Sequence, residues 1–552
     1  MKFGYLTVVT LCLMSAFGCS SEKTPVYKDA SADIEARVND LLGRMTLEEK
    51  ILQLNQYVLG VNTVENNFGE VVKDIPVEIG SLIYFNDYAE VRNAMQKKAM
   101  EESRLGIPIL FGHDVIHGYR TTYPIPLALA CSWNPELVRQ ASEVAAQEAY
   151  DCGVNWTFSP MVDVSRDPRW GRVMECFGED PYANAVFCEA VVKGYQGDDM
   201  SEKHRIAACL KHYVGYGASE AGRDYVPTEI SDQTLWDTYL PPFEAGVKAG
   251  AATLMSAFHT ISGIPASANH YILTEVLKEK WQHDGFVVSD WGAVEQLRYQ
   301  GMAEDEKEAT MLAFNAGIEM DMADRMYQKY LAELLEEGKV DMKLVDESVR
   351  RILRVKFRLG LFERPYVEEK PESEMYLLPK SLEIAEKAAA ESMVLLKNNG
   401  VLPLDPAKVK TIAVVGPNAN SIPALEGILM EAERGLTVSG YNMNTGIRTH
   451  LEAEVSTPGS MVLNARLLGE IVRRLPDDME TISVSDKYVV SVCCGDASYE
   501  VPGLSAEDYP ELPDVSSSRS ISIPQLALKE MISGTIFAVA ENQGRPVHTG
   551  VK

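Results

Sequence analysis

Short apolar segments alternate with amphipathic helical segments from about residue 80 to residue 320, and this alternation constrains the fold most. It is typical of parallel strands covered by helices. Over this length it favours a TIM-like (β/α)8 barrel over an open sheet. The sequence leaves one barrel strand unassigned. The expected strands are Gly80–Phe85, Ile107–His113, Trp156–Val162, Ala207–Tyr213, Ala252–Phe258, Gly285–Ser289 and Gly317–Met320.

The fold class predicted for the whole chain is α/β, with two folded domains. A helical entry segment, Asp33–Gln56, carries the capping-box residues Thr46 and Glu49, and the barrel is expected over residues 33–360. A charged, proline-containing linker follows at residues 361–387. Residues 388–552 are expected to form a smaller, shortened α/β sandwich. Its expected elements are a helix, Ser381–Lys397, and parallel-type strands at Thr411–Gly416, Tyr488–Cys494 and Thr535–Ala540.

The first residues resemble a targeting segment. Lys2 precedes the apolar run Phe3–Phe17, which has the length of a signal-peptide core and is too short to span a bilayer. Small residues before Cys19 resemble a bacterial lipoprotein processing site, and simple cleavage is the alternative. Residues 1–19 are therefore predicted to be a signal peptide. The mature protein is expected to be exported, in the periplasm or as an outer-membrane lipoprotein anchored through Cys19.

Charge and cysteine spacing narrow the classes of partner. The net charge of −28 disfavours nucleic-acid binding, because phosphate backbones are bound by Lys and Arg. The nine cysteines follow no metal-ligand spacing. His113 and His117 have no third ligand at a suitable spacing, so neither a metal nor another cofactor is predicted. A small oligosaccharide or glycoside fits this chain better.

Polar residues stand at the ends of the expected strands, where the active sites of barrel enzymes lie. Asp114 follows one strand, Arg172 lies in the loop after the next, and Lys211 and His212 end a third. Met255 is on a fourth strand, and Asp290 and Trp291 end a fifth. Together they offer the carboxylate, guanidinium, ammonium and imidazole groups that bind a polyhydroxyl ring.

These segments resemble glycoside hydrolase family 3, in the same order along the chain. The match is densest in Val276–Ala293, which includes Gly285-Phe286-Val287-Val288-Ser289-Asp290-Trp291. The resemblance implies that Asp290 is the nucleophile and that Asp114, Arg172, Lys211 and His212 bind the sugar. Met255 is interpreted as pocket wall, and Trp291 either stacks on a sugar or packs under the next helix.

The resemblance also implies a second carboxyl group, supplied by the second domain as acid and base. Gly495–Gly503 resembles the family pattern with one residue missing, which makes Glu500 the candidate. Glu507, Asp508 and Asp514 are alternatives, and a solvated loop glutamate is the competing interpretation.

The predicted function is a retaining, exo-acting glycosidase that releases terminal β-D-glucose. The loop Tyr213–Glu220 contains no histidine, which argues against the family branch that cleaves N-acetylhexosaminides. Two alternatives stay open. One is a β-xylosidase with the same machinery, and the other is a sugar-binding remnant whose second domain supplies no acid.

Overall fold

The computed structural model describes residues 24–59, 75–85, 88–405, 407–409, 411–412 and most of 427–506. Within the last range, it leaves out 434, 442–445, 465–467, 469–470, 473–474, 476–478, 486–488 and 496. The chain divides into two units, Met1–Lys397 and Asn398–Lys552. The predicted signal peptide, most of the expected strand Thr411–Gly416 and the expected strand Thr535–Ala540 lie outside the described residues.

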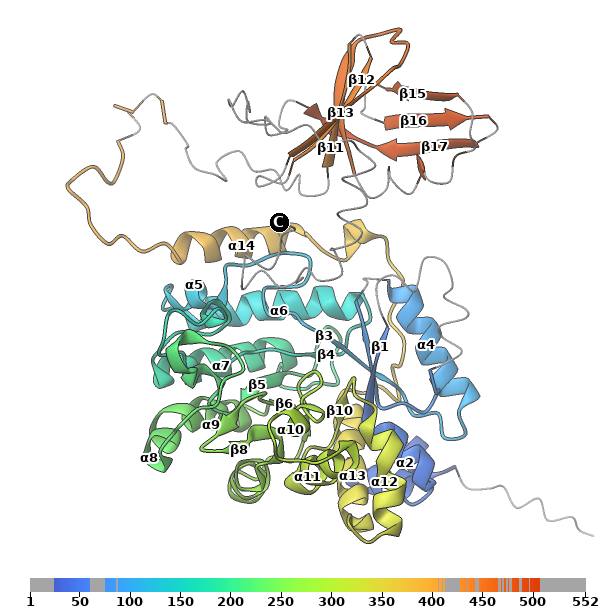
Figure 1. Ribbon diagram of the computed structural model, residues 1–552, viewed down its shortest axis with the longest axis vertical. Helices are drawn as coiled ribbons and strands as arrows, with labels where there is room; N and C mark the ends of the chain where they lie inside the picture. Colours follow the sequence, from blue (N-terminus) through green and yellow to red (C-terminus); the bar gives the residue numbers. More distant parts are fainter. Residues whose placement is uncertain are drawn as a thin grey trace, which may run out of the picture. The chain divides into compact units, whose positions relative to one another are not determined.

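The first unit is built on a ring of parallel strands (Figure 1). A five-stranded sheet of order β10-β1-β2-β3-β4 meets a three-stranded sheet of order β5-β6-β9. Parallel bridges from Trp156 to Ala207 and from Val288 to Met320 close the ring. The α/β barrel predicted from the sequence is thus confirmed. Its strands are β1 (Asn55–Leu59), β2 (Ser81–Tyr84), β3 (Leu110–His113), β4 (Trp156–Thr157), β5 (Cys209–Tyr213), β6 (Thr253–Ser256), β9 (Phe286–Val288) and β10 (Asp321–Met322), and β7 (Thr260–Ile261) and β8 (Ile264–Pro265) form a small hairpin.

Helices follow most of the strands and cover the outside of the ring (Figure 1). Among the described residues, no helix is both long and apolar enough to cross a bilayer. The helices are α1 (Ile34–Leu42), α2 (Leu47–Gln53), α4 (Ala89–Glu102), α5 (Pro126–Ala130), α6 (Pro135–Asp151), α7 (Pro181–Gln196), α8 (Asp232–Thr234), α9 (Leu240–Lys248), the π-helix Tyr271–Lys280, α10 (Gln296–Tyr299), α11 (Glu306–Ala316), α12 (Met326–Glu336), α13 (Met342–Arg358) and α14 (Pro379–Glu391).

The barrel strand that the sequence left unassigned is β1. The entry segment was expected to stay helical to Gln56, but α2 ends at Gln53 and Asn55 begins the strand. The capping box of Thr46 and Glu49 is present, as predicted. Strand β1 is hard to recognise in the sequence because it begins with two polar residues. Asn55 Nδ2 donates to Ile51 O (2.7 Å), and Gln56 Nε2 donates to Ser81 Oγ (2.8 Å). Inside a barrel such residues can be buried because these bonds replace their contacts with water.

Two other expected boundaries differ from the structure. The strand expected at Gly317–Met320 is β10, Asp321–Met322. The helix expected to reach Lys397 ends at Glu391, and Met393–Leu396 are non-helical and exposed. That helix, α14, packs on α6 and α5 of the first unit.

In the part of the second unit that the structure describes, the strands form two antiparallel sheets. Their strand orders are β13-β12-β11-β14-β18 and β15-β16-β17. The parallel pairing expected for Tyr488–Cys494 is wrong, because β16 pairs antiparallel with both of its neighbours. Apolar residues of both sheets, among them Met430, Leu463 and Val492, share one core. The strands are β11 (Gly427–Ala432), β12 (Leu436–Tyr441), β13 (Gly446–Leu451), β14 (Gly459–Asn464), β15 (Glu480–Val484), β16 (Val489–Cys494), β17 (Ala497–Pro502) and β18 (Leu504–Ser505).

Gly285 lets β9 enter the barrel beside β6. A Cβ atom on Gly285 would lie 1.8 Å from the carbonyl oxygen of Ala252, which is backbone and cannot move aside. We expect Gly285→Ala to lower the free energy of unfolding by about 3 kcal/mol, because the overlap forces the two strands apart. Gly171→Ala is the matched control, since nothing lies within 4 Å of a Cβ there. Equal stability of the two variants in urea unfolding would contradict this account of β9.

Candidate active site

A cavity of about 410 Å³ opens at the carboxyl ends of the barrel strands. Polar residues from β3, β5 and β9 line it together with aromatic and aliphatic side chains. All the site residues that the sequence predicted within the first unit meet there: Asp114, Arg172, Lys211, His212, Met255, Asp290 and Trp291. Parallel strands bring these positions together because their carboxyl ends share one rim of the barrel.

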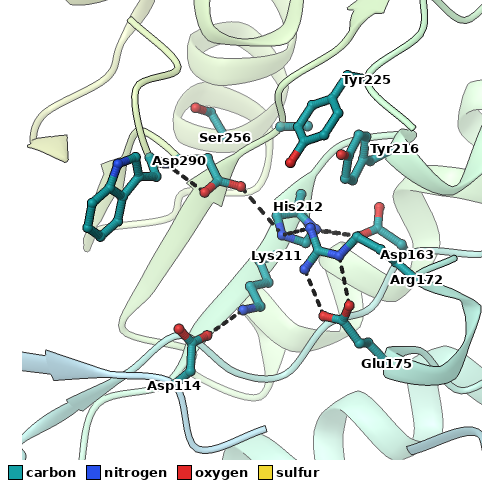
Figure 2. A network of polar contacts seen from close by, with 12 residues as sticks. Asp114, Asp163, Arg172, Glu175, Lys211, His212, Tyr216, Tyr225, Ser256 and Asp290 are labelled. Atoms are coloured by element: carbon teal, nitrogen blue, oxygen red, sulfur yellow. Dashed lines mark hydrogen bonds and ion pairs between the residues drawn. The ribbon is translucent and has the colours of Figure 1, made fainter. Parts of the chain in front are cut away.

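Asp290 follows β9 and is 7% exposed. Its Oδ1 accepts a hydrogen bond from the backbone N–H of Trp291 at 2.7 Å. Its Oδ2 accepts no hydrogen bond from any described residue and lies 3.5 Å from His212 Nε2 (Figure 2). Burial raises the pKa of Asp290 to about 7, although Lys211 and Arg172 act in the opposite direction. One oxygen of this cavity-lining carboxylate is therefore buried and has a lone pair that no described donor occupies.

Lys211 and Asp114 form an ion pair on the floor of the site. Lys211 Nζ lies 2.7 Å from Asp114 Oδ1. The lysine side chain is 7% exposed and the aspartate side chain is 55% exposed. A lysine with this little contact with water keeps its charge best beside a carboxylate. The pair presents both donors and acceptors to a hydroxyl-rich ligand.

Arg172 is held in a fixed orientation by Glu175. The guanidinium Nε and Nη2 donate to the two carboxylate oxygens at 2.8 and 2.7 Å (Figure 2). This bidentate geometry is the most directional arrangement that an arginine can make with a carboxylate. The third nitrogen, Nη1, lies 3.2 Å from His212 Nε2. Glu175 thus orients Arg172.

His212 is buried and contacts a carboxylate that sequence reasoning did not single out. Asp163 Oδ2 accepts from the backbone N–H of His212 and lies 2.9 Å from its Nδ1. Burial, together with the charges of Arg172 and Lys211, holds the pKa of His212 well below its usual value. Asp163 stands just after an expected strand, as the predicted residues do, so its position was a usable signal.

Aromatic side chains form the upper wall of the cavity. Trp291 is 47% exposed, lines the cavity and lies 6.4 Å, centroid to centroid, from the ring of Phe85. Its exposure favours the stacking interpretation over packing beneath the next helix. Phe85, Tyr225 and Phe258 also line the cavity, and the sequence analysis missed them. Tyr225 comes from a loop with no strand or motif to mark it.

Glu500 belongs to the second unit. It belongs to β17, where its backbone pairs with Ser491 of β16, and only its backbone is described. The alternative residues Glu507, Asp508 and Asp514 lie outside the described residues. The assignment of an acid therefore stays a prediction. Over the described ranges, no group of three or more His, Cys, Asp or Glu side chains is arranged to hold a metal ion.

Residues 46–355, more than half of the chain, match the model of the glycosyl hydrolase family 3 N terminal domain. The chain belongs to glycosyl hydrolase family 3. The family assignment made from the sequence motifs is confirmed. Residues 407–513 match a different model, the N-terminal domain of the DNA polymerase III beta subunit. The family 3 match thus lies within the barrel unit, and the described antiparallel sheets lie in the segment with the second match.

Relatives of this family 3 chain include a periplasmic beta-glucosidase of Salmonella typhimurium. It is 41% identical over 396 residues, which make up 70% of this chain and 51% of the relative. A putative beta-xylosidase of Formosa agariphila is 36% identical over 412 residues, 71% of this chain and 54% of the relative. The chain spans about half the length of these curated relatives.

The solved structures with a similar fold include a beta-glucosidase from Listeria innocua in complex with glucose. It aligns with a TM-score of 0.63 and 40% identity, over 67% of this chain and 53% of that one. A mutant of the same enzyme, in complex with laminaribiose, aligns with the same TM-score and 41% identity, over 67% and 53% of the two chains.

Asp290→Asn should stabilise the first unit at neutral pH but not in acid. The raised pKa means that folded Asp290 holds a proton up to about pH 7, whereas unfolded aspartate loses it near pH 4. Stability therefore falls as pH rises through this window. Asparagine removes the buried charge, and its Nδ2 can donate to His212 Nε2. We expect the variant's gain in Tm over the wild type to grow from pH 4.5 to pH 8.

The matched control is Asp305→Asn, at the exposed N-cap of α11, where the side chain accepts from Glu308 N. Its difference in Tm from the wild type should change little with pH. A gain for Asp290→Asn that is the same at pH 4.5 and pH 8 would show that Asp290 is not destabilised by burial.

Proposed function

We propose that the protein is a retaining, exo-acting glycoside hydrolase that releases terminal β-D-glucose. The observation that supports this most is the Oδ2 of buried Asp290, which accepts no hydrogen bond from the described residues, in a cavity whose cations Lys211 and Arg172 are each paired with a carboxylate. A nucleophile needs a free lone pair, and Asp290 Oδ2 has one. The cavity volume of about 410 Å³ suits a small sugar rather than a polymer chain.

In the proposed reaction Asp290 Oδ2 attacks the anomeric carbon. A bond forms between them as the bond to the leaving oxygen breaks, and that oxygen takes a proton from a carboxylic acid. Water then attacks the anomeric carbon of the glycosyl-enzyme, gives its proton to the same carboxylate and frees Asp290. Arg172 and Lys211 donate to ring hydroxyls, and Asp114 accepts from those hydroxyls through the oxygen that faces away from Lys211. His212, whose two ring nitrogens contact Asp163 and Arg172, holds Arg172 in place.

The acid in this scheme is assigned to Glu500 only as a prediction. It rests on the resemblance of Gly495–Gly503 to the family pattern. If the second unit supplies no acid, glycosides with good leaving groups will still react, because they need little protonation. Cellobiose, whose leaving group is a sugar, will not. The sugar-binding remnant is the limiting case in which neither substrate reacts.

The second candidate is a β-xylosidase. The relative from Formosa agariphila named a putative beta-xylosidase supports it. The two sugars differ by one hydroxymethyl group, so the space around the hydroxyls bound by Asp114 decides between them. The beta-glucosidase relative and the glucose-bound neighbour favour glucose.

Export is part of the proposal. The periplasmic relative supports the signal peptide predicted at residues 1–19, a segment that lies outside the described residues. The lipid anchor at Cys19 stays a prediction.

The test is hydrolysis of 4-nitrophenyl β-glucoside, 4-nitrophenyl β-xyloside and cellobiose by the wild type and by Asp290→Ala. We expect the glucoside to be preferred, and the variant to lose about 10³-fold or more in kcat/KM because no other group can attack the anomeric carbon. Asp305→Ala is the control, with kcat/KM unchanged. Undiminished hydrolysis by Asp290→Ala would end the proposal. A preference for the xyloside would instead support the second candidate function, a β-xylosidase.

A further inference from the structure

Asp163 is a carboxylate of this site to which the proposed reaction assigns no role. Its side chain is fully buried, and it lies just beyond the segment whose backbone bridges β5, where Val162 N donates to Lys211 O at 2.8 Å. It therefore sits behind His212, on the side away from Asp290 (Figure 2). A buried carboxylate costs free energy of folding, so one behind a site residue needs a reason.

The contacts of His212 determine which of its nitrogens carries the proton. Asp163 Oδ2 lies 2.9 Å from Nδ1 and also accepts the backbone N–H of His212. Because Oδ2 already accepts this backbone N–H, it acts as the acceptor toward the ring as well, so Nδ1 must be the N–H. On the other side of the ring, Arg172 Nη1 lies 3.2 Å from Nε2. A guanidinium only donates, so Nε2 must be the acceptor.

A doubly protonated His212 fits these contacts less well. Its Nε2–H would point at the guanidinium of Arg172, which is nearer (3.2 Å) than Asp290 Oδ2 (3.5 Å). Lys211 and Arg172 also place two positive charges beside the ring. The neutral ring with the proton on Nδ1 suits both Asp163 and Arg172 at once.

His212 connects Asp163 both to Arg172 and to the nucleophile Asp290. His212 Nε2 supplies the third contact of Arg172, whose other nitrogens are held by Glu175. Because Nε2 has no hydrogen, His212 cannot donate to Asp290 Oδ2, and that oxygen keeps its lone pair for attack. With the proton on Nε2 instead, the histidine would oppose Arg172 and bind the nucleophile.

We propose that Asp163 is a positioning residue that holds His212 in the Nδ1–H tautomer, so that Nε2 accepts from Arg172 and Asp290 Oδ2 stays free. The effect of this tautomer on turnover rests on the proposed function. The assignment of the tautomer is independent of that function, because it can be measured without any substrate.

The experiment is ¹⁵N NMR of the full chain labelled at histidine, at pH 7, with the His212 signals assigned by their loss in His212→Gln. We expect wild-type His212 to be neutral, with Nδ1 protonated. In Asp163→Asn the amide keeps the shape but loses the charge and one acceptor, while N–H groups of His212 and Gly217 still point at it. The Nε2–H tautomer should then become populated, and kcat/KM for 4-nitrophenyl β-glucoside should fall by about 10²-fold or more.

Asp321→Asn is the matched control. Asp321 is equally buried and begins β10. Burial raises its pKa to about 7, as it does the pKa of Asp163, but Asp321 accepts from the backbone of α12 instead of from a histidine. This variant should leave the His212 signals unchanged. Any loss of activity in it measures the effect of removing a buried carboxylate elsewhere on the rim.

Wild-type His212 with a protonated Nε2 would overturn the proposal, whether or not Asp163→Asn folds. So would an Asp163→Asn variant that loses activity while its His212 stays wholly in the Nδ1–H form. If instead the tautomer behaves as expected but no glycoside is hydrolysed by the wild type, the proposed function fails and the role of Asp163 at His212 stands.

Discussion

The burial of the Asp290 carboxylate is the constraint on which the rest of the site depends. A charge with little access to water is tolerated only where nearby charges and dipoles replace the water. Here one backbone N–H bonds one oxygen, and the cations Lys211 and Arg172 stabilise the charge from farther away. Each cation is itself held by a carboxylate, Asp114 or Glu175. The result is a rim of alternating charges in which Asp290 Oδ2 accepts no hydrogen bond from the described residues.

Parallel strands explain why much of this rim could be predicted from the sequence. Their carboxyl ends point the same way, so a residue after one strand lies near a residue after the next even when about a hundred positions separate them. Asp114, Lys211 and Asp290 were found on this ground. Tyr225 could not be, because the loop that carries it has no periodicity. Strand β1 could not be predicted either, because Asn55 and Gln56 are polar. The hydrogen bonds that allow their burial cannot be read from the sequence.

The second unit shows where sequence patterns fail. An apolar segment such as Val489–Cys494 predicts a strand but not the direction of its neighbours, since parallel and antiparallel strands can carry the same residues. The segment after it closes as a tight hairpin, with Cys494 opposite Ala497, and Glu500 continues in the next strand. The similarity of this segment to a family pattern therefore says nothing about which sheet surrounds it. The match of residues 407–513 to another family's model makes the origin of the acid the open question of the mechanism.

The most direct test of the central claim is to trap the covalent intermediate. The chain is incubated with 2-deoxy-2-fluoro-β-D-glucosyl fluoride, digested with protease and analysed by mass spectrometry. If Asp290 is the nucleophile of a retaining glycosidase, one fluoroglucosyl group will be found on the peptide that contains Asp290. A label on another residue, or steady hydrolysis of glycosides with no label at all, would contradict the account.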